Sequence, residues 1–257
     1  MTGNVQGLKL KRVSAQILAV LLLTTAAYAQ EKNAAEVYNK AKDYYENGRY
    51  KEAITELNTA IEIDPKNSKA YLYRGSAYYK IAYSFTSQAI ADFSKVIELE
   101  PKNADAYYSR GFILGRGVFD SALTDLNKAI ELNPKYTQAY YERGFVYFKM
   151  GDYDKAISDF DKLIEFDPKN ADAYYDRAFA YDRKGDYDKA IADYTKTIEL
   201  KPDLASAYNE RAMEYFKKQE YDKAWEDVSK AEKLGYEINP EFLSDLKKAS
   251  GKEKVTP

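Results

Sequence analysis

The sequence predicts an all-α fold in which helical hairpins follow one another along the chain. Prolines recur at intervals of 36, 33, 34 and 34 residues, each interval holds two stretches with helical apolar spacing, and a short turn separates the two. The prolines are Pro65, Pro101, Pro134, Pro168 and Pro202. A fixed period of this length indicates an array of repeated units.

The first 29 residues have the pattern of a secretory signal peptide. Three basic residues precede an apolar run that is densest over 17–23, and Ala27-Tyr28-Ala29 follows as a small-residue cleavage site. The run is shorter than the roughly 20 residues that a spanning helix needs. We expect cleavage after Ala29, export to the periplasm or secreted space, and no stable membrane insertion afterwards. An uncleaved anchor is the alternative.

Repeated units then fill residues 34–238. Their expected bounds are 34–67, 68–103, 104–136, 137–170, 171–204 and 205–238. In the fourth unit, Tyr140, Gly144 and Tyr147 share one face of a first helix, and Ala156 and Phe160 share one face of a second. Gly151 supplies the turn between them. A last amphipathic stretch at 239–250 is expected to cap the array, followed by a flexible tail at 251–257.

Two columns of small residues recur in these units. The first-helix column holds Ala41, Gly75, Gly111, Gly144, Ala178 and Ala212. The second-helix column holds Ala53, Ala89, Ala122, Ala156, Ala190 and Ala224. Small side chains let two helix backbones approach closely.

With the closing prolines, these columns resemble the tetratricopeptide repeat family over nearly all of 34–238. The resemblance implies a right-handed α-solenoid of about six hairpins plus a C-terminal capping helix.

Opposite charges recur in step with the repeat. An arginine precedes the small first-helix residue at 74, 110, 143, 177 and 211, and an aspartate recurs on the second helix at 92, 125, 159, 193 and 227. Lys40 and Glu56 take these places in the first unit. We predict five Arg–Asp pairs, because a partly buried guanidinium needs a carboxylate. A row of arginines that binds anions is the alternative.

Aromatic side chains dominate the first helices, and 26 of the 257 residues are tyrosine. The resemblance implies that first helices line a concave surface where ligands lie. The residues predicted to form a partner-binding groove there are Tyr108, Phe112, Tyr141, Phe145, Phe148, Tyr175 and Phe179. Large aromatic rings provide contact area at a small entropy cost. Packing between repeats is the competing interpretation, and sugar rings could also stack here.

The family's lysine and asparagine clamp for carboxylates is missing, since Tyr38 and Lys42 occupy its first two positions.

The composition excludes several kinds of chemistry. The chain has no cysteine and no histidine, and its 39 basic residues are balanced by 41 acidic ones. Disulfides, thiolate nucleophiles and Cys or His metal ligands are therefore absent, and no basic surface for nucleic acid is indicated. We expect no catalytic residue, no cofactor and no metal site.

The predicted function is a non-catalytic scaffold or adaptor of the cell envelope or secreted space. Its predicted partner is a peptide or protein bound in the aromatic groove. An adaptor for envelope assembly or polysaccharide export, with a glycan on the aromatic rings, is the alternative. A hydrolase that uses carboxylates is a remote third possibility, because its acids recur in every unit whereas a catalytic pair should be unique.

Overall fold

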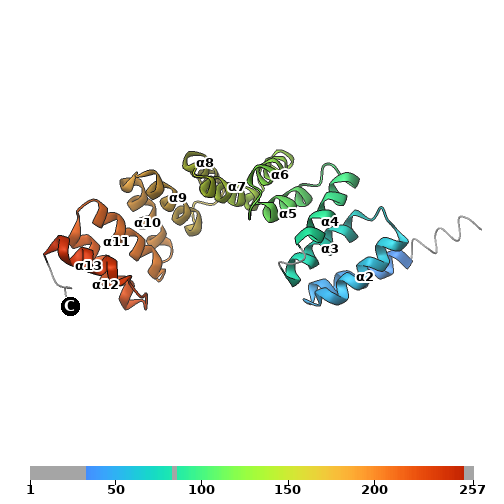
Figure 1. The fold of residues 1–257 in the computed structure, drawn as a ribbon, viewed down its shortest axis with the longest axis horizontal. Helices are drawn as coiled ribbons and strands as arrows, with labels where there is room; N and C mark the ends of the chain where they lie inside the picture. The colour runs from blue at the N-terminus through green and yellow to red at the C-terminus, as the bar shows by residue number, and fades with distance from the viewer. Residues whose placement is uncertain (1–32, 83–85, 252–257) are drawn as a thin grey trace, which may run out of the picture. The chain divides into compact units, whose positions relative to one another are not determined.

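The computed structural model describes residues 33–82 and 86–251. All regular secondary structure in these two ranges is helical, and neither range contains a strand, so the predicted all-α repeat fold is confirmed (Figure 1). The predicted signal peptide and its cleavage site after Ala29 lie outside the described residues.

The chain divides into two compact units, residues 1–113 and 114–257, and each is described by itself. Unit 1 contains a helix over residues 33–46, α2 (Tyr50–Ile63), α3 (Ser68–Ile81), α4 (Thr86–Leu99) and α5 (Ala104–Leu114), which ends at the unit boundary. Unit 2 contains α6 (Phe119–Leu132), α7 (Thr137–Met150), α8 (Tyr153–Phe166), α9 (Ala171–Lys184), α10 (Tyr187–Leu200), α11 (Ala205–Lys217), α12 (Tyr221–Lys233) and α13 (Pro240–Ser250). Within unit 2, each helix from α6 to α13 packs against the next one along the chain.

Recurring local signals start and end these helices. Gly151 and Gly185 end α7 and α9 in the left-handed conformation, with φ of 80° and 83°. Glycine adopts this conformation without a steric penalty. Asn67 and Asn170 cap α3 and α9, each accepting a 3.1 Å hydrogen bond from a backbone N–H in the first turn. The glycines thus mark the turn inside two hairpins, and the asparagine caps mark the start of two hairpins.

The two helices of a hairpin touch through the small-residue columns. All six second-helix alanines are fully buried. A Cβ added to Gly144 would lie 3.0 Å from Phe160 Cε1 and 3.2 Å from the Cβ of Asp159. The same geometry holds for Gly75 opposite Phe93. A Cβ at either position would thus be in tight contact with the facing helix, and an alanine there would require the ring to shift by a few tenths of an ångström.

Four of the five predicted Arg–Asp pairs are present. In each, Nε and Nη2 of the arginine donate to the two oxygens of the aspartate, at 2.6–2.9 Å. The pairs are Arg74 with Asp92, Arg143 with Asp159, Arg177 with Asp193, and Arg211 with Asp227. Lys40 and Glu56 pair at 2.6 Å in the first repeat. The pair between Arg110 and Asp125, on α5 and α6, stays a prediction.

Each of these arginines also reaches the preceding repeat. Its Nη1 donates to a polar side chain 16 residues earlier, at 2.5–2.9 Å. The acceptors are Asn58 for Arg74, Ser94 for Arg110, Asn127 for Arg143, Asp161 for Arg177, and Thr195 for Arg211. The guanidinium therefore joins its own hairpin to the second helix of the hairpin before it. This use of the donors favours a structural role over an anion-binding row.

Many of the tyrosines lie beside these arginines. The guanidinium of Arg143 lies 5.4 Å from the ring centre of Tyr140 and 6.0 Å from that of Tyr147. Arg177 and Arg211 are flanked in the same way, by tyrosines three residues before and four residues after. Such cation–π contacts stabilise a partly desolvated cation. Many of the tyrosines in this chain therefore stabilise the arginines through their rings, and others lie on the surface.

The C-terminal helix α13 covers the last hairpin. Leu246 on α13 and Trp225 and Val228 on α12 are buried in one cluster. Trp225 Nε1 donates a hydrogen bond of 3.1 Å to Ser250 Oγ. Packing against α12 gives α13 the position expected of a cap.

Replacing Asp159 by alanine should strongly destabilise the protein. The Asp159 and Arg143 side chains are only 4% and 19% exposed, so the variant leaves a cation largely buried without its carboxylate. We expect the free energy of unfolding to fall by about 3–5 kcal/mol, measured by urea denaturation. The control is Glu165→Ala, which removes the exposed partner of Lys162 and should change stability by less than about 1 kcal/mol. Equal effects of the two substitutions would contradict a structural role for the pair.

Candidate functional site

Five of the seven predicted groove residues lie together in unit 2. Tyr141, Phe145 and Phe148 come from α7, and Tyr175 and Phe179 from α9. Phe148 contacts Phe179, with ring centres 5.4 Å apart, so the two first helices are neighbours. We call the surface formed by α7, α9 and α11 the first-helix face.

Tyr141 and Phe145 are the exposed aromatic residues of this face. The two residues are 38% and 42% exposed, and the other exposed large hydrophobic residues in the described part of the chain are Val118 and Met150. Large rings in water without a cover carry a free-energy penalty. These two rings therefore mark the part of the face best suited to a partner.

The other three aromatic residues of the face are half-buried. Phe148 also packs against Tyr153, with ring centres 5.4 Å apart, and Tyr175 packs edge-on against Tyr194 at 5.5 Å. Packing between helices accounts for part of their surface. The packing interpretation therefore holds for these residues, and partner binding by the exposed rings stays a prediction.

The remaining two predicted residues, Tyr108 and Phe112, lie on α5 in unit 1. Their ring centres are 6.1 Å apart, and Phe112 also lies 5.4 Å from Tyr79 of α3. Both are half-buried. They form a separate aromatic group on the first helices of unit 1.

Three carboxylates that the sequence analysis missed stand on the first-helix face. Glu142, Asp176 and Glu210 each directly precede an arginine, at 34-residue spacing, and each is half-buried. Burial raises the pKa of Glu142 to about 7 and that of Asp176 to about 6, and it also raises the pKa of Glu210. The sequence does contain a signal for them, because an acidic residue directly precedes the first-helix arginine in the fourth, fifth and sixth repeats and in no other repeat.

Two deeper polar groups lack hydrogen-bond partners among the described residues. They are the Tyr194 hydroxyl and Glu214 Oε2, on residues that are 0% and 1% exposed. The positions equivalent to Tyr194 hold Phe93 and Phe160 in other repeats, and those equivalent to Glu214 are apolar from the second repeat to the fifth. Unpaired buried polar atoms are destabilising, so these two are exceptions to the packing of this array.

The cations on this face are already engaged. Lys217 Nζ pairs with Asp182, and it lies 2.9 Å from Glu214 Oε1. Lys149 lies 4.5 Å from the ring centre of Phe145, and the Arg183 guanidinium lies 5.0 Å from that of Phe179. The rings of this face therefore already accept cations from the chain itself.

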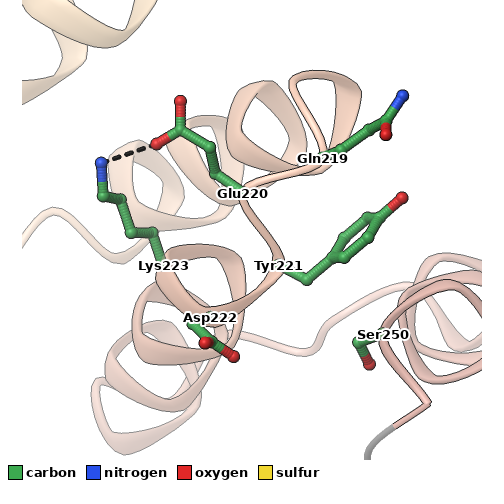
Figure 2. Close-up of a pocket in the computed structure, with 6 residues that line it drawn as sticks. All are labelled: Gln219, Glu220, Tyr221, Asp222, Lys223 and Ser250. Atoms are coloured by element: carbon green, nitrogen blue, oxygen red, sulfur yellow. Dashed lines mark hydrogen bonds and ion pairs between the residues drawn. The ribbon is translucent and has the colours of Figure 1, made fainter.

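A pocket of about 410 Å³ lies elsewhere in unit 2, at the turn between α11 and α12 and the end of α13. Its lining residues are Gln219, Glu220, Tyr221, Asp222, Lys223 and Ser250 (Figure 2). Lys223 and Glu220 form an ion pair of 2.6 Å within it. The pocket includes none of the seven predicted groove residues.

The described ranges contain neither a candidate metal-binding cluster nor a candidate membrane-spanning helix. In residues 33–82 and 86–251, no group of three or more acidic side chains is placed to hold a metal ion. No helix in those ranges is both long enough and apolar enough to cross a bilayer.

The stability of the protein should depend on the protonation of Glu214. Burial raises its folded-state pKa from 4.5 to about 7, so the folded chain binds this proton more tightly than the unfolded chain does. The stabilising contribution is therefore complete below about pH 4.5 and is lost as the pH rises through about 7. We expect the wild-type free energy of unfolding to fall, relative to Glu214→Gln, between about pH 5 and pH 8. Urea denaturation across this range measures it, with Glu165→Gln as the exposed control, and parallel pH profiles of wild type and Glu214→Gln would refute it.

Comparison with known proteins identifies the repeat. The family model "TPR repeat" matches residues 41–81, 86–116, 115–151 and 146–185, and the model "Tetratricopeptide repeat" matches residues 171–204. Two plant proteins match single stretches. The DnaJ protein P58IPK homolog of Arabidopsis thaliana is 39% identical over 61 residues, 24% of this chain and 13% of that protein. The Protein SGT1 homolog of Oryza sativa subsp. japonica is 36% identical over 72 residues, 28% of this chain and 20% of that protein.

Solved structures show the same architecture over longer stretches. MamA superposes with a TM-score of 0.62 at 30% identity, covering 67% of this chain and 94% of MamA. YrrB, a TPR protein with an unusual peptide-binding site, has a TM-score of 0.62 at 28% identity, covering 72% of this chain and 94% of YrrB. A tetratricopeptide repeat protein from Parabacteroides merdae has a TM-score of 0.58 at 26% identity, covering 86% and 85%. The "TPR repeat" model alone matches more than half of the chain. The chain belongs to the tetratricopeptide repeat family.

Proposed function

We propose that this protein is a non-catalytic scaffold that binds a peptide or partner protein on the first-helix face of unit 2. Proteins of this family act as scaffolds for protein interactions, and the matching models indicate no catalytic family. The observation that carries the site is the exposure of Tyr141 and Phe145 beside the half-buried Tyr175 and Phe179. The likeness to YrrB, a protein with a peptide-binding site, supports the same conclusion.

The physical basis is apolar area that a ligand can cover. Tyrosine and phenylalanine offer wide, rigid surfaces, so a partner gains contact area without ordering many rotatable bonds. Tyr141 adds a hydroxyl that interacts with Asp176 across the two helices, which holds both side chains in place. Such a surface suits an extended peptide or the side of a partner helix.

A photo-crosslinking amino acid placed at residue 145 should capture the partner in cells. The same amino acid at residue 162, an exposed position on α8, should not, because α8 is a second helix. Replacing the exposed Tyr141 by alanine should reduce capture from residue 145 while leaving the fold intact by circular dichroism. Identical crosslinked products from both positions, or capture unaffected by Tyr141→Ala, would refute binding at this face.

We further propose that the scaffold works in the cell envelope or the secreted space. The support for this is the signal-like pattern of residues 1–29. The full chain has a mass of 29.4 kDa, and we expect the protein purified from its native source to lack those 29 residues and to begin at Gln30. Intact-mass measurement checks this expectation, and a protein that retains Met1 or the apolar run 17–23 would contradict cleavage after Ala29.

A further inference from the structure

We propose that the peptide bound on the first-helix face is basic, and that its lysine or arginine side chains pair with Glu142, Asp176 and Glu210. This proposal rests on the proposed function and adds the chemistry of the ligand. It begins from a row of carboxylates on three successive first helices, α7, α9 and α11, beside the exposed aromatic rings. The equivalent positions in the first three repeats hold Asn39, Tyr73 and Ser109, so the row is a property of unit 2.

These three carboxylates lack a direct ion pair in the described part of the chain. Cations act on two of them only at longer range, Arg116 and Lys149 on Glu142, and Lys217 and Arg183 on Glu210. No ion pair within 4.0 Å involves Glu142, Asp176 or Glu210 in the described ranges. The arginine that follows each of them donates instead to an aspartate on the second helix. Partial burial raises the pKa of all three and destabilises their charged form, and the nearby cations and hydrogen bonds offset this only in part. A cationic ligand would remove that penalty.

The buried Glu214 is an independent observation that points to a cationic ligand. It stands one helical turn after Glu210, is 1% exposed, and leaves Oε2 without a partner. The Tyr194 hydroxyl, equally unpartnered, experiences the charges of Glu210, Glu214 and Asp182. Apolar residues fill both positions in neighbouring repeats, so packing alone does not require these polar groups. Both groups are buried and Lys217 already donates to Glu214 Oε1, so they add negative charge beneath Glu210 and do not themselves contact the ligand.

The aromatic rings favour the same ligand. Phe145 and Phe179 already carry the chain's own Lys149 and Arg183 over their rings, at 4.5 and 5.0 Å. An incoming lysine or arginine could lay its methylene stem on a ring and place its charged end at a carboxylate. An acidic peptide would face the unpaired carboxylates instead, and like charges brought together weaken binding.

The test compares three synthetic nonapeptides that share their apolar residues and differ only in alternate positions, which are lysine, glutamate or glutamine. Binding to the full chain is measured by fluorescence polarisation at about 50 mM and about 300 mM salt. We expect the lysine peptide to bind, the glutamine peptide to bind about tenfold more weakly, and the glutamate peptide not to bind. Added salt should weaken only the lysine peptide.

A matched pair of variants separates the face from the overall charge. The triple substitution Glu142→Gln, Asp176→Asn and Glu210→Gln should weaken the lysine peptide by about tenfold or more. These changes are isosteric, and melting curves show whether the variant is folded.

The control removes the same number of acids from second helices, at the same 34-residue spacing. Its substitutions are Glu131→Gln, Glu165→Gln and Glu199→Gln, and each replaced acid is at least 58% exposed and pairs with a lysine three residues earlier. We expect no change in binding of the lysine peptide. Equal losses in the two variants would overturn the proposal, because binding would then reflect net charge.

Other outcomes also overturn it, and they differ from a failure of the proposed function. If the glutamate or glutamine peptide binds as tightly as the lysine peptide, the face binds peptides but does not select basic ones. If sedimentation shows self-association that the triple variant abolishes, the occupant is a second copy of the chain. If no peptide binds and the crosslinker at residue 145 captures nothing, the proposed function fails together with this inference.

Discussion

The bonding of the first-helix arginine, present from the second repeat to the sixth, is the interaction on which the array depends. Arg143 uses Nε and Nη2 on Asp159 of its own hairpin and Nη1 on Asn127 of the hairpin before it. One buried cation thus sets the pairing of two helices and the stacking of two repeats. The desolvation of the aspartate, which raises its pKa, is offset by the guanidinium. Tyrosine rings on either side of Arg143 complete its surroundings.

The first helices therefore have two kinds of surface. The side that carries the small residues and the arginine is committed to packing, and it is nearly the same in every repeat. The side that carries Tyr141, Glu142 and Phe145 is free of that constraint and differs between repeats. Because stability comes from the first side, the second can hold exposed rings and unpaired carboxylates without loss of the fold. This separation would let a repeated scaffold carry the local binding surface that we propose.

Much of the fold could be predicted from the sequence because every signal occurs several times. A single alanine at 156 says little, but six alanines in register identify a close helix contact, and the same holds for the arginines and aspartates. The acceptors from the preceding repeat could not be predicted in this way. Asn58, Ser94 and Asp161 share only the ability to accept a hydrogen bond, so no common residue type marks their column.

The candidate site was predictable only in part. The aromatic residues are visible in the sequence, but the exposure of each ring depends on its neighbours, which is why Phe148 packs while Phe145 does not. Burial of Glu214 follows from the contact between successive repeats. The first repeat has an acid, Asp43, at the same position, and there it is exposed. Register along the array thus decides whether the same residue type is solvated or buried.

The hydrogen bond from each arginine to the preceding repeat is polar along the array, because the donor always lies in the later repeat and the acceptor in the earlier one. Removing the last hairpin would deprive Thr195 of a donor and leave a neutral hydroxyl that water can satisfy. Removing hairpins from the other end would leave a guanidinium N–H of the next arginine without its acceptor, as for Arg177 without Asp161. The two ends of the chain are therefore not equivalent. For Arg143 and Arg177, one acceptor stands 16 residues before the arginine, in the preceding hairpin, and the aspartate of the same hairpin stands 16 residues after it. Each arginine is therefore bonded in both directions along the chain.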